Sequence, residues 1–312
     1  MKKRAVSSLL ASLAVVSFIL PALAAAPSEQ VPAEETAPPP AATETETPAW
    51  APFHLDFKPQ YSMEYQTCNG VTYVTVSSFV AMVDPNATVE EENGIVTVTS
   101  AKMEQMVDGS GNTANVVQET LNMTVTAGAT YIVANGRYLY VKDGVILLNN
   151  SVAAPVRVLA KVFNLDVAYD GEQKTVYLGH PWMADHFYIT PGDSFYDADS
   201  LYWLSRIIYA ESGNQILAGK IAVGNVVMNR VNSSIFPSNI YDVLHQKNQF
   251  TSVYGSNFGR TPNAESVIAA KLVLDGAEVL PTALFFARAG LNCYASRNRP
   301  YVATIGAHAF YA

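Results

Sequence analysis

Cysteine, charge and histidine are scarce in this sequence, and each shortage narrows the possible functions. Only two of its 312 residues are cysteine, five are histidine and 15% are charged. An exported protein can pair its cysteines, but nothing in the sequence brings Cys68 and Cys293 together, and we expect two unpaired thiols. His186, His245 and His308 lack the close spacing of zinc ligands. We therefore expect no metal and no cofactor.

Long apolar runs are missing after the N-terminal segment, so we expect no stable membrane span in the mature chain. Residues 1–4 are basic, residues 5–20 are apolar, and residues 22–24 (Ala-Leu-Ala) form a cleavage motif. This pattern predicts a signal peptide over residues 1–24 and a secreted or cell-envelope location. An uncleaved anchor is the alternative, although the apolar run is short for one. Residues 25–52, rich in Pro, Ala, Thr and Glu, predict a disordered linker.

The few charges are unevenly distributed. Residues 51–199 carry seven basic and seventeen acidic residues, a net charge of −10, whereas residues 200–312 carry nine basic and five acidic residues, a net charge of +4. The C-terminal part is therefore attracted to anionic polymers such as bacterial cell wall. An exported, acidic chain without a basic run is a poor partner for nucleic acid. We expect no nucleic-acid partner and a monomer.

Residues 53–180 have the pattern of a β-rich α+β domain with a weak internal repeat. Residues 70–98 and 151–178 each predict a strand, a short amphipathic helix and a β-hairpin. The hairpins turn at Asn93-Gly94 and Asp170-Gly171, which are strong hairpin dipeptides. Further strands are expected at residues 122–126, 130–133, 138–141 and 145–148.

Residues 181–199 predict a linker, and residues 200–312 predict a second, mainly helical domain. Asp197 or Asp199 is expected to cap its first helix, which ends at Gly213. Three more helical segments are expected at residues 214–231, 240–245 and 261–276, the last one starting from Thr261-Pro262. A strand at residues 283–287 and a hairpin over residues 301–311 complete the expected elements.

One carboxylate lies on the apolar stripe of the first helix. Leu204, Ile207, Ile208 and Glu211 stand at positions i, i+3, i+4 and i+7, which share one helix face. A carboxyl group that faces inward is partly desolvated, and desolvation raises its pKa. A carboxyl that stays protonated near neutral pH can donate a proton, as glycosidases require. The alternative is a glutamate that reaches back to solvent.

Several phrases of the C-terminal region carry a family resemblance. They are residues 206–211, 219–230, 236–237, 240–243, 249–250, 283–286 and 299–310. On these phrases, residues 203–312 resemble the cell wall hydrolase family of the SleB/CwlJ spore-cortex-lytic type. The resemblance implies a lysozyme-like or lytic-transglycosylase-like α+β fold. It also implies peptidoglycan as partner, cleavage between N-acetylmuramic acid and N-acetylglucosamine, and a catalytic role for Glu211. Residues 287–298 lack the aromatic and proline pattern expected there.

The middle region resembles a copper amine oxidase N-terminal-like domain, an accessory module of secreted bacterial enzymes. The resemblance rests on residues 154–159 (Ala-Pro-Val-Arg-Val-Leu) and on the hairpin that follows. It does not imply copper, because the region's histidines, His54 and His180, lie at its two ends without a ligand cluster. We expect a stalk or a wall-binding accessory domain.

The reaction can follow a one-carboxylate or a two-carboxylate route. Most glycosidases use two carboxylates, and Asp242 is the best second candidate. A single-acid mechanism fits better. In it Glu211 protonates the leaving oxygen and then removes the proton of the muramyl 6-hydroxyl, which gives a 1,6-anhydro product. Hydrolysis by water, as in a muramidase or an amidase, is the alternative.

Six further residues are candidates for substrate binding, and each also has a structural explanation. An aromatic ring can stack on a sugar or pack in the core, and an amide or imidazole can bind substrate or backbone. Asn225, which is not among the six, could also bind substrate through its amide. For both Asn225 and Asn229 we favour a structural role. The six candidates are Gln249, Phe250, Tyr209, Asn229, Tyr301 and His308.

Three other classes of protein compete with the glycosidase. A thiol peptidase would use Cys293 and His308, but residues 291–294 have a loop pattern rather than the helix start that lowers a cysteine pKa. A zinc amidase would need clustered ligands. A non-catalytic protein that only binds peptidoglycan is the third alternative.

Overall fold

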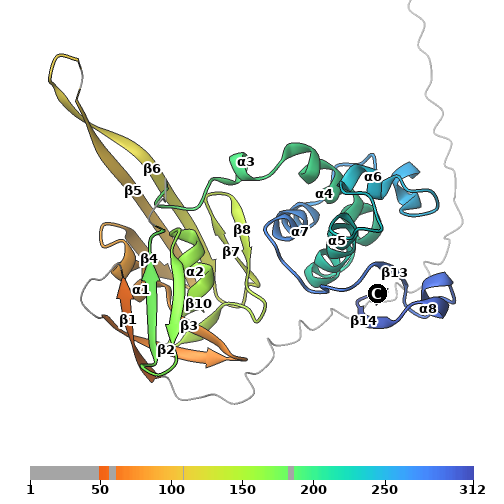
Figure 1. Cartoon of the computed structure of the whole chain (residues 1–312), viewed down its shortest axis with the longest axis horizontal. Helices are drawn as coiled ribbons and strands as arrows, with labels where there is room; N and C mark the ends of the chain where they lie inside the picture. The colour runs from red at the N-terminus through yellow and green to blue at the C-terminus, as the bar shows by residue number, and fades with distance from the viewer. Residues whose placement is uncertain (1–48, 56–60, 108, 182–185) are drawn as a thin grey trace, which may run out of the picture. The chain divides into compact units, whose positions relative to one another are not determined.

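The computed structural model describes residues 49–55, 61–107, 109–181 and 186–312. All of them belong to one compact unit, in which a strand-rich region precedes a mainly helical one (Figure 1). The expected signal peptide, and the expected linker up to residue 48, lie outside the described residues. Residues 49–52, which we expected to belong to the disordered linker, are instead part of a strand that starts at Ala49 and pairs with residues 61–65.

The larger sheet has seven described strands in the order β11-β12-β1-β2-β3-β10-β9. Neighbouring strands are antiparallel, except β1 and β12, which are parallel. The helices α1 (Val76–Val83) and α2 (Val156–Val162) pack on β3 and β10. The strands are Ala49–Leu55 (β1), Tyr61–Cys68 (β2), Val71–Thr75 (β3), Ile146–Leu148 (β9), Ser151–Pro155 (β10), Asp166–Asp170 (β11) and Thr175–Gly179 (β12).

Both repeat units have the predicted order of strand, helix and hairpin, but their hairpin turns differ. Asn93 and Gly94 have φ angles of 52° and 75°, as a tight two-residue turn requires. The second hairpin turns more widely, because the carboxylate of Asp170 accepts the backbone N–H groups of Glu172 and Gln173. The prediction of a two-residue Asp-Gly turn was therefore wrong.

A five-stranded sheet follows the order β4-β5-β6-β7-β8. Alternate residues of β5, such as Val96 and Val98, are fully buried, which is the pattern of a sheet with one face on the core. Strands β5 and β6 continue as a long hairpin arm that extends beyond their neighbours (Figure 1), and the sequence did not predict this arm. The strands are Thr88–Glu92 (β4), Ile95–Val107 (β5), Thr113–Thr126 (β6), Tyr131–Ala134 (β7) and Arg137–Tyr140 (β8).

The helical region is built around α4, α5 and α7, which pack on one another. Gly224 permits this packing, because a Cβ atom there would lie 2.9 Å from Val273 and 3.0 Å from Ile208. A small sheet in the order β13-β15-β14 completes the region. The elements are Gly192–Phe195 (α3), Ala198–Ser212 (α4), Leu217–Val231 (α5), Ile240–Leu244 (α6), Thr251–Tyr254 (η1), Ala264–Leu274 (α7), Phe285–Arg288 (β13), Tyr294–Asn298 (α8), Tyr301–Ile305 (β14) and His308–Tyr311 (β15).

Two expectations for the helical region differ from the structure. Helix α7 starts at Ala264 rather than at Thr261-Pro262, because the side chain of Asn263 accepts the backbone N–H of Ser266 and caps the helix. The segment 181–199 is also more than a linker. Its residues Tyr188 and Ile189 are buried in the core of the strand-rich region.

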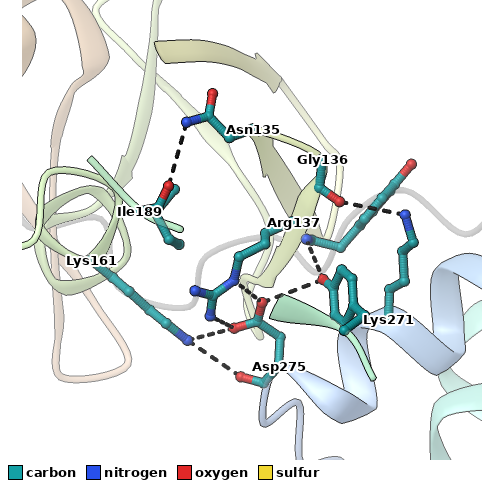
Figure 2. A network of polar contacts seen from close by, with 9 residues as sticks. Asn135, Gly136, Arg137, Lys161, Ile189, Lys271 and Asp275 are labelled. Atoms are coloured by element: carbon teal, nitrogen blue, oxygen red, sulfur yellow. Dashed lines mark hydrogen bonds and ion pairs between the residues drawn. The ribbon is translucent and has the colours of Figure 1, made fainter. Parts of the chain in front are cut away.

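Asp275, directly after α7, joins the helical region to the strand-rich region (Figure 2). Its carboxylate accepts hydrogen bonds from Arg137 Nε and Nη2 at 2.8 and 2.9 Å and from Lys161 Nζ at 2.6 Å. The side chain of Asp275 is 1% exposed and that of Arg137 is 8% exposed. A bidentate guanidinium and a second cation thus neutralise one buried carboxylate. The directional hydrogen bonds fix how the two regions contact each other at this point.

Candidate active site around Glu211

Helix α4 places Glu211 at the edge of the core. The helix begins at Asp197, whose side chain accepts the backbone N–H of Ser200, and it ends before Gly213, as the sequence predicted. Leu204, Ile207 and Ile208 are fully buried, whereas Glu211 is half-buried. The Glu211 carboxyl group therefore lies at the boundary between the core and solvent, where it is only partly exposed to water.

A serine from a distant segment holds this carboxyl group. Ser252, in η1, donates a hydrogen bond of 2.5 Å to Glu211 Oε1. Burial raises the pKa of Glu211, and the Ser252 hydroxyl opposes that rise by stabilising the charged form, with a net raised pKa. The raised pKa extends the protonated form of Glu211 to higher pH than in a solvated glutamate, which is the direction that a general acid needs.

Glu211 lines a cavity of about 350 Å³ together with amide and aromatic side chains. Gln249 and Phe250 lie beside it in this lining, and Phe285, Phe286 and Tyr294 complete the aromatic part. Rings and amides are the groups that contact sugar faces and N-acetyl groups. Within the described part of the chain, Glu211 is the one carboxylate of the lining. Asp242 is not in the lining, is exposed, and accepts a hydrogen bond from Asn239.

Arg230 is a buried cation in the same lining, and the sequence reasoning missed its role. It is 3% exposed, and Nε donates to the carbonyl oxygen of Leu284 at 2.7 Å. The guanidinium lies 5.0 Å from the ring centroids of Phe236 and Phe250 and 5.1 Å from that of Phe285. Burial lowers the pKa of Arg230 to about 10. Arg230 thus ties the aromatic wall of the cavity to helix α5.

Two asparagines on α5 have the structural role that we favoured. Asn225 donates to the carbonyl oxygen of Ala277 at 2.7 Å and accepts the backbone N–H of Val279. Asn229 donates to the carbonyl oxygens of Leu280 and Ala283, both at 2.9 Å. These bonds fix the segment that follows α7 and leave neither amide in the cavity lining.

Three other candidates lie outside the described lining of the cavity. Tyr209 packs beside Gly213, on the same helix as Glu211. Tyr301 is 62% exposed and donates to Thr304 Oγ1 at 3.0 Å. His308 stands behind the cavity wall, with its ring edge-on to Phe286 at 5.4 Å. Of the six substrate-binding candidates, the structure thus brings Gln249 and Phe250 together with Glu211.

Cys293 does line the cavity, and it caps a helix instead of lying in a loop. The expectation of a loop failed because α8 has only five residues, too few to show a helical period. Hydrogen bonds from Ser296 lower the pKa of the Cys293 thiol. Among the described residues no hydrogen bond joins the Cys293 thiol to the His308 ring, whose buried Nδ1 has no hydrogen-bond partner. The geometry therefore does not form the thiol–imidazole pair of a peptidase.

Two absences hold for the part of the chain that the structure describes. There, no three His, Cys, Asp or Glu side chains come close enough to hold a metal ion together. None of the described helices has the length and apolar character needed to span a membrane.

Comparison with known proteins supports both resemblances seen in the sequence. The sequence model of a family described as cell wall hydrolase matches residues 214–311. That of the copper amine oxidase N-terminal domain matches residues 54–178. Glu211 lies just before the first match, so its assignment rests on the geometry described above.

The similar curated proteins are spore cortex-lytic enzymes. That of Bacillus cereus is 27% identical over 118 residues, which are 37% of this chain and 45% of that protein. That of Oceanobacillus iheyensis is 26% identical over 120 residues, which are 37% of this chain and 42% of that protein. The aligned part of the chain thus spans less than half the length of these relatives.

Two solved structures are also similar. The catalytic domain of the Bacillus cereus SleB protein is 26% identical, with a TM-score of 0.35, over 38% of this chain and 92% of that one. The catalytic domain of the germination-specific lytic transglycosylase SleB from Bacillus anthracis is 26% identical, with a TM-score of 0.36, over 39% of this chain and 100% of that one. By the two family models, residues 214–311 match the cell wall hydrolase family that the sequence phrases indicated, and residues 54–178 match the copper amine oxidase N-terminal domain.

Proposed function

We propose that this chain is an exported enzyme that cleaves the glycan strands of peptidoglycan between N-acetylmuramic acid and N-acetylglucosamine, with Glu211 as its single acid and base. The observation that carries the proposal is the half-buried Glu211 carboxyl, with a raised pKa, in a cavity lined by amide and aromatic groups. The match of residues 214–311 to the cell wall hydrolase family supports the choice of polymer.

The reaction begins with the protonated Glu211. Its proton passes to the glycosidic oxygen as the bond to the muramyl anomeric carbon breaks, and the N-acetylglucosamine end leaves as an alcohol. The Glu211 carboxylate then takes the proton of the muramyl 6-hydroxyl, whose oxygen bonds to the anomeric carbon. This step closes a 1,6-anhydro ring and restores the acid form of Glu211 without consuming water.

Ser252 and the cavity wall have separate tasks in this scheme. The Ser252 hydroxyl donates to Oε1 and so orients the carboxyl group, and it stabilises the carboxylate formed after the first proton transfer. Phe285 and the exposed Tyr294 offer ring surface to a pyranose, Phe250 packs mainly in the core beneath the cavity, and Gln249 offers an amide to an N-acetyl group. Arg230 contacts the rings of Phe250 and Phe285 and links them to helix α5.

Hydrolysis by water is the competing reaction, and it would need a group to activate that water. Two-carboxylate glycosidases supply a second carboxylate about 5–9 Å from the first. The described lining of this cavity offers only Glu211, which favours the intramolecular route.

Digestion of purified sacculi in water enriched in oxygen-18, followed by mass spectrometry, tests the proposal. The proposed route gives anhydromuramyl ends without oxygen-18. Reducing ends that carry oxygen-18 would mean hydrolysis. Intact glycan strands would mean a protein that binds the wall without cleaving it, which would overturn the proposal.

A further inference from the structure

A second cavity lies in the strand-rich region and contains no part of the Glu211 site. Its volume is about 420 Å³, and its walls come from β2, β3, α2, β11 and β12. Tyr65 lies in β2, the strand before the first repeat unit, and Thr72 lies within that unit. Arg157 and Val167 belong to the second repeat unit. The cavity therefore exists only where the two halves of this region meet.

The charge of this cavity is opposite to that of the region around it. Residues 51–199 carry a net charge of −10, yet the charged side chains in the described lining are Arg157 and Lys174, both basic. Neither forms an ion pair with any acid that the structure describes, and both are exposed. Two uncompensated cations that face one cavity raise the local concentration of anions.

The backbone and a hydrogen bond set the positions of these two cations. Arg157 Nη1 donates to the carbonyl oxygen of Val167 at 3.2 Å, which ties the guanidinium to β11. Lys174 has a left-handed backbone, with φ of 51°, in the wide turn before β12. The side chains thus come from two different elements and converge on the same cavity.

The remaining walls are aromatic and apolar. Tyr65 is half-buried and Tyr169 is 60% exposed, so at least one ring offers a free face. Val156 and Val176 supply an apolar surface between them. An aromatic ring beside an apolar floor with a few polar groups is the composition of a small-ligand site, and the exposed ring suits the C–H face of a sugar.

We propose that this cavity binds a carboxylate-bearing sugar unit of the wall glycan, with its pyranose ring on Tyr169 and its carboxylate between Arg157 and Lys174. A planar guanidinium pairs with a carboxylate through two hydrogen bonds, and the lysine adds a point charge. The choice of glycan rests on the proposed function, but binding here does not involve Glu211. The strand-rich region then holds the strand that the Glu211 cavity cleaves.

Isothermal titration calorimetry on the full chain with Glu211→Gln tests this inference, because that variant does not consume its ligand. The probe is the disaccharide N-acetylglucosaminyl-N-acetylmuramic acid with a free lactyl carboxylate, compared with its methyl ester. We expect Arg157→Gln/Lys174→Gln to bind the free acid at least tenfold more weakly than the parent, and we expect the parent to bind the ester as weakly as that variant does. The matched control, Lys142→Gln/Arg260→Gln, removes the same charge from exposed sites outside both cavities and should bind like the parent.

Two outcomes would overturn the inference. One is equal affinity of the parent for the acid and its ester, and the other is unchanged affinity in Arg157→Gln/Lys174→Gln. A third variant, Tyr169→Ala, separates the sugar contact from the charge contact, since it should weaken binding of the acid and the ester alike. These are binding measurements, so a chain without glycosidase activity would fail the test of the proposed function and could still pass this one.

Discussion

The hydroxyl of Ser252 donates a 2.5 Å hydrogen bond to Oε1 of Glu211, across 41 residues of sequence. This bond connects the helix that carries the acid with the short turn that follows Phe250. It also opposes the effect of burial on the pKa of Glu211, so the two residues together set the pH at which the acid loses its proton.

Ser252→Ala should shift the pH dependence of glycan cleavage toward higher pH. The substitution removes the one bond that lowers the pKa of Glu211, so burial raises that pKa further and the loss of activity with rising pH comes later. The maximal rate should fall roughly tenfold, because a bond to a charged group contributes about 1.5 kcal/mol. Rates of muropeptide release across pH measure both effects. Ser256→Ala, at an exposed position nearby, should change neither.

Glu211→Gln should reduce the pH dependence of stability. The folded-state pKa of Glu211 is raised, so the folded chain binds a proton that the unfolded chain releases. In the wild type, this proton binding stabilises the folded state at low pH, and the stabilisation is lost as pH rises from about the pKa of an unfolded glutamate through the raised folded-state pKa. Glutamine does not titrate, so the variant lacks this loss of stability. Urea unfolding at a series of pH values should show a shallower decline for the variant. Parallel curves would contradict the raised pKa.

Asp275→Asn should weaken the contact between the strand-rich and helical regions. The substitution leaves Arg137, 8% exposed, without its charged partner, and an uncompensated buried charge costs about 3–5 kcal/mol. We expect lower stability and faster proteolysis between the regions, in the segment around residues 181–199. Urea unfolding and limited proteolysis measure these effects. Glu278→Gln, at an exposed site a few residues away, is the control and should behave as wild type.

Arg230→Met should loosen the aromatic wall of the active-site cavity. It removes the hydrogen bond to Leu284 and the contacts with three rings, with an expected loss of about 2–4 kcal/mol. Arg230→Lys should recover little, because an ammonium group cannot reproduce a planar guanidinium among ring faces. Thermal unfolding measures both variants, and a stability equal to that of wild type would remove Arg230 from this account. Arg288→Gln, at an exposed site on the same strand β13, serves as the comparison.

The part of the site that local sequence determines could be predicted. The stripe from Leu204 to Glu211 and the cap at Asp197 depend on residues within one helix, and both have the expected positions. The start of α7 could not be fixed in the same way, because Thr261-Pro262 and Asn263 are both acceptable caps. In the structure, the hydrogen bond from the backbone N–H of Ser266 to the side chain of Asn263 shows that Asn263 is the cap.

The residues that complete the site depend on tertiary packing and could not be predicted from local sequence patterns. Ser252 reaches Glu211 because η1 packs on α4, and no periodic pattern precedes that short turn. Arg230 stands at the end of an apolar helix where a solvated basic residue is ordinary, and only the folded chain surrounds it with rings. The long β5/β6 arm was missed for a related reason, since its exposed strands lack the apolar alternation of a half-buried sheet.

The role of Glu211 as the acid is tested most directly by muropeptide release from purified sacculi by the wild type, Glu211→Gln and Glu278→Gln. Loss of a general acid costs about 10²–10⁴-fold in rate. We therefore predict that release falls at least 100-fold in Glu211→Gln, while Glu278→Gln and the wild type release fragments at the same rate. Release by Glu211→Gln at the wild-type rate, from a protein that unfolds at the same temperature, would contradict the assignment.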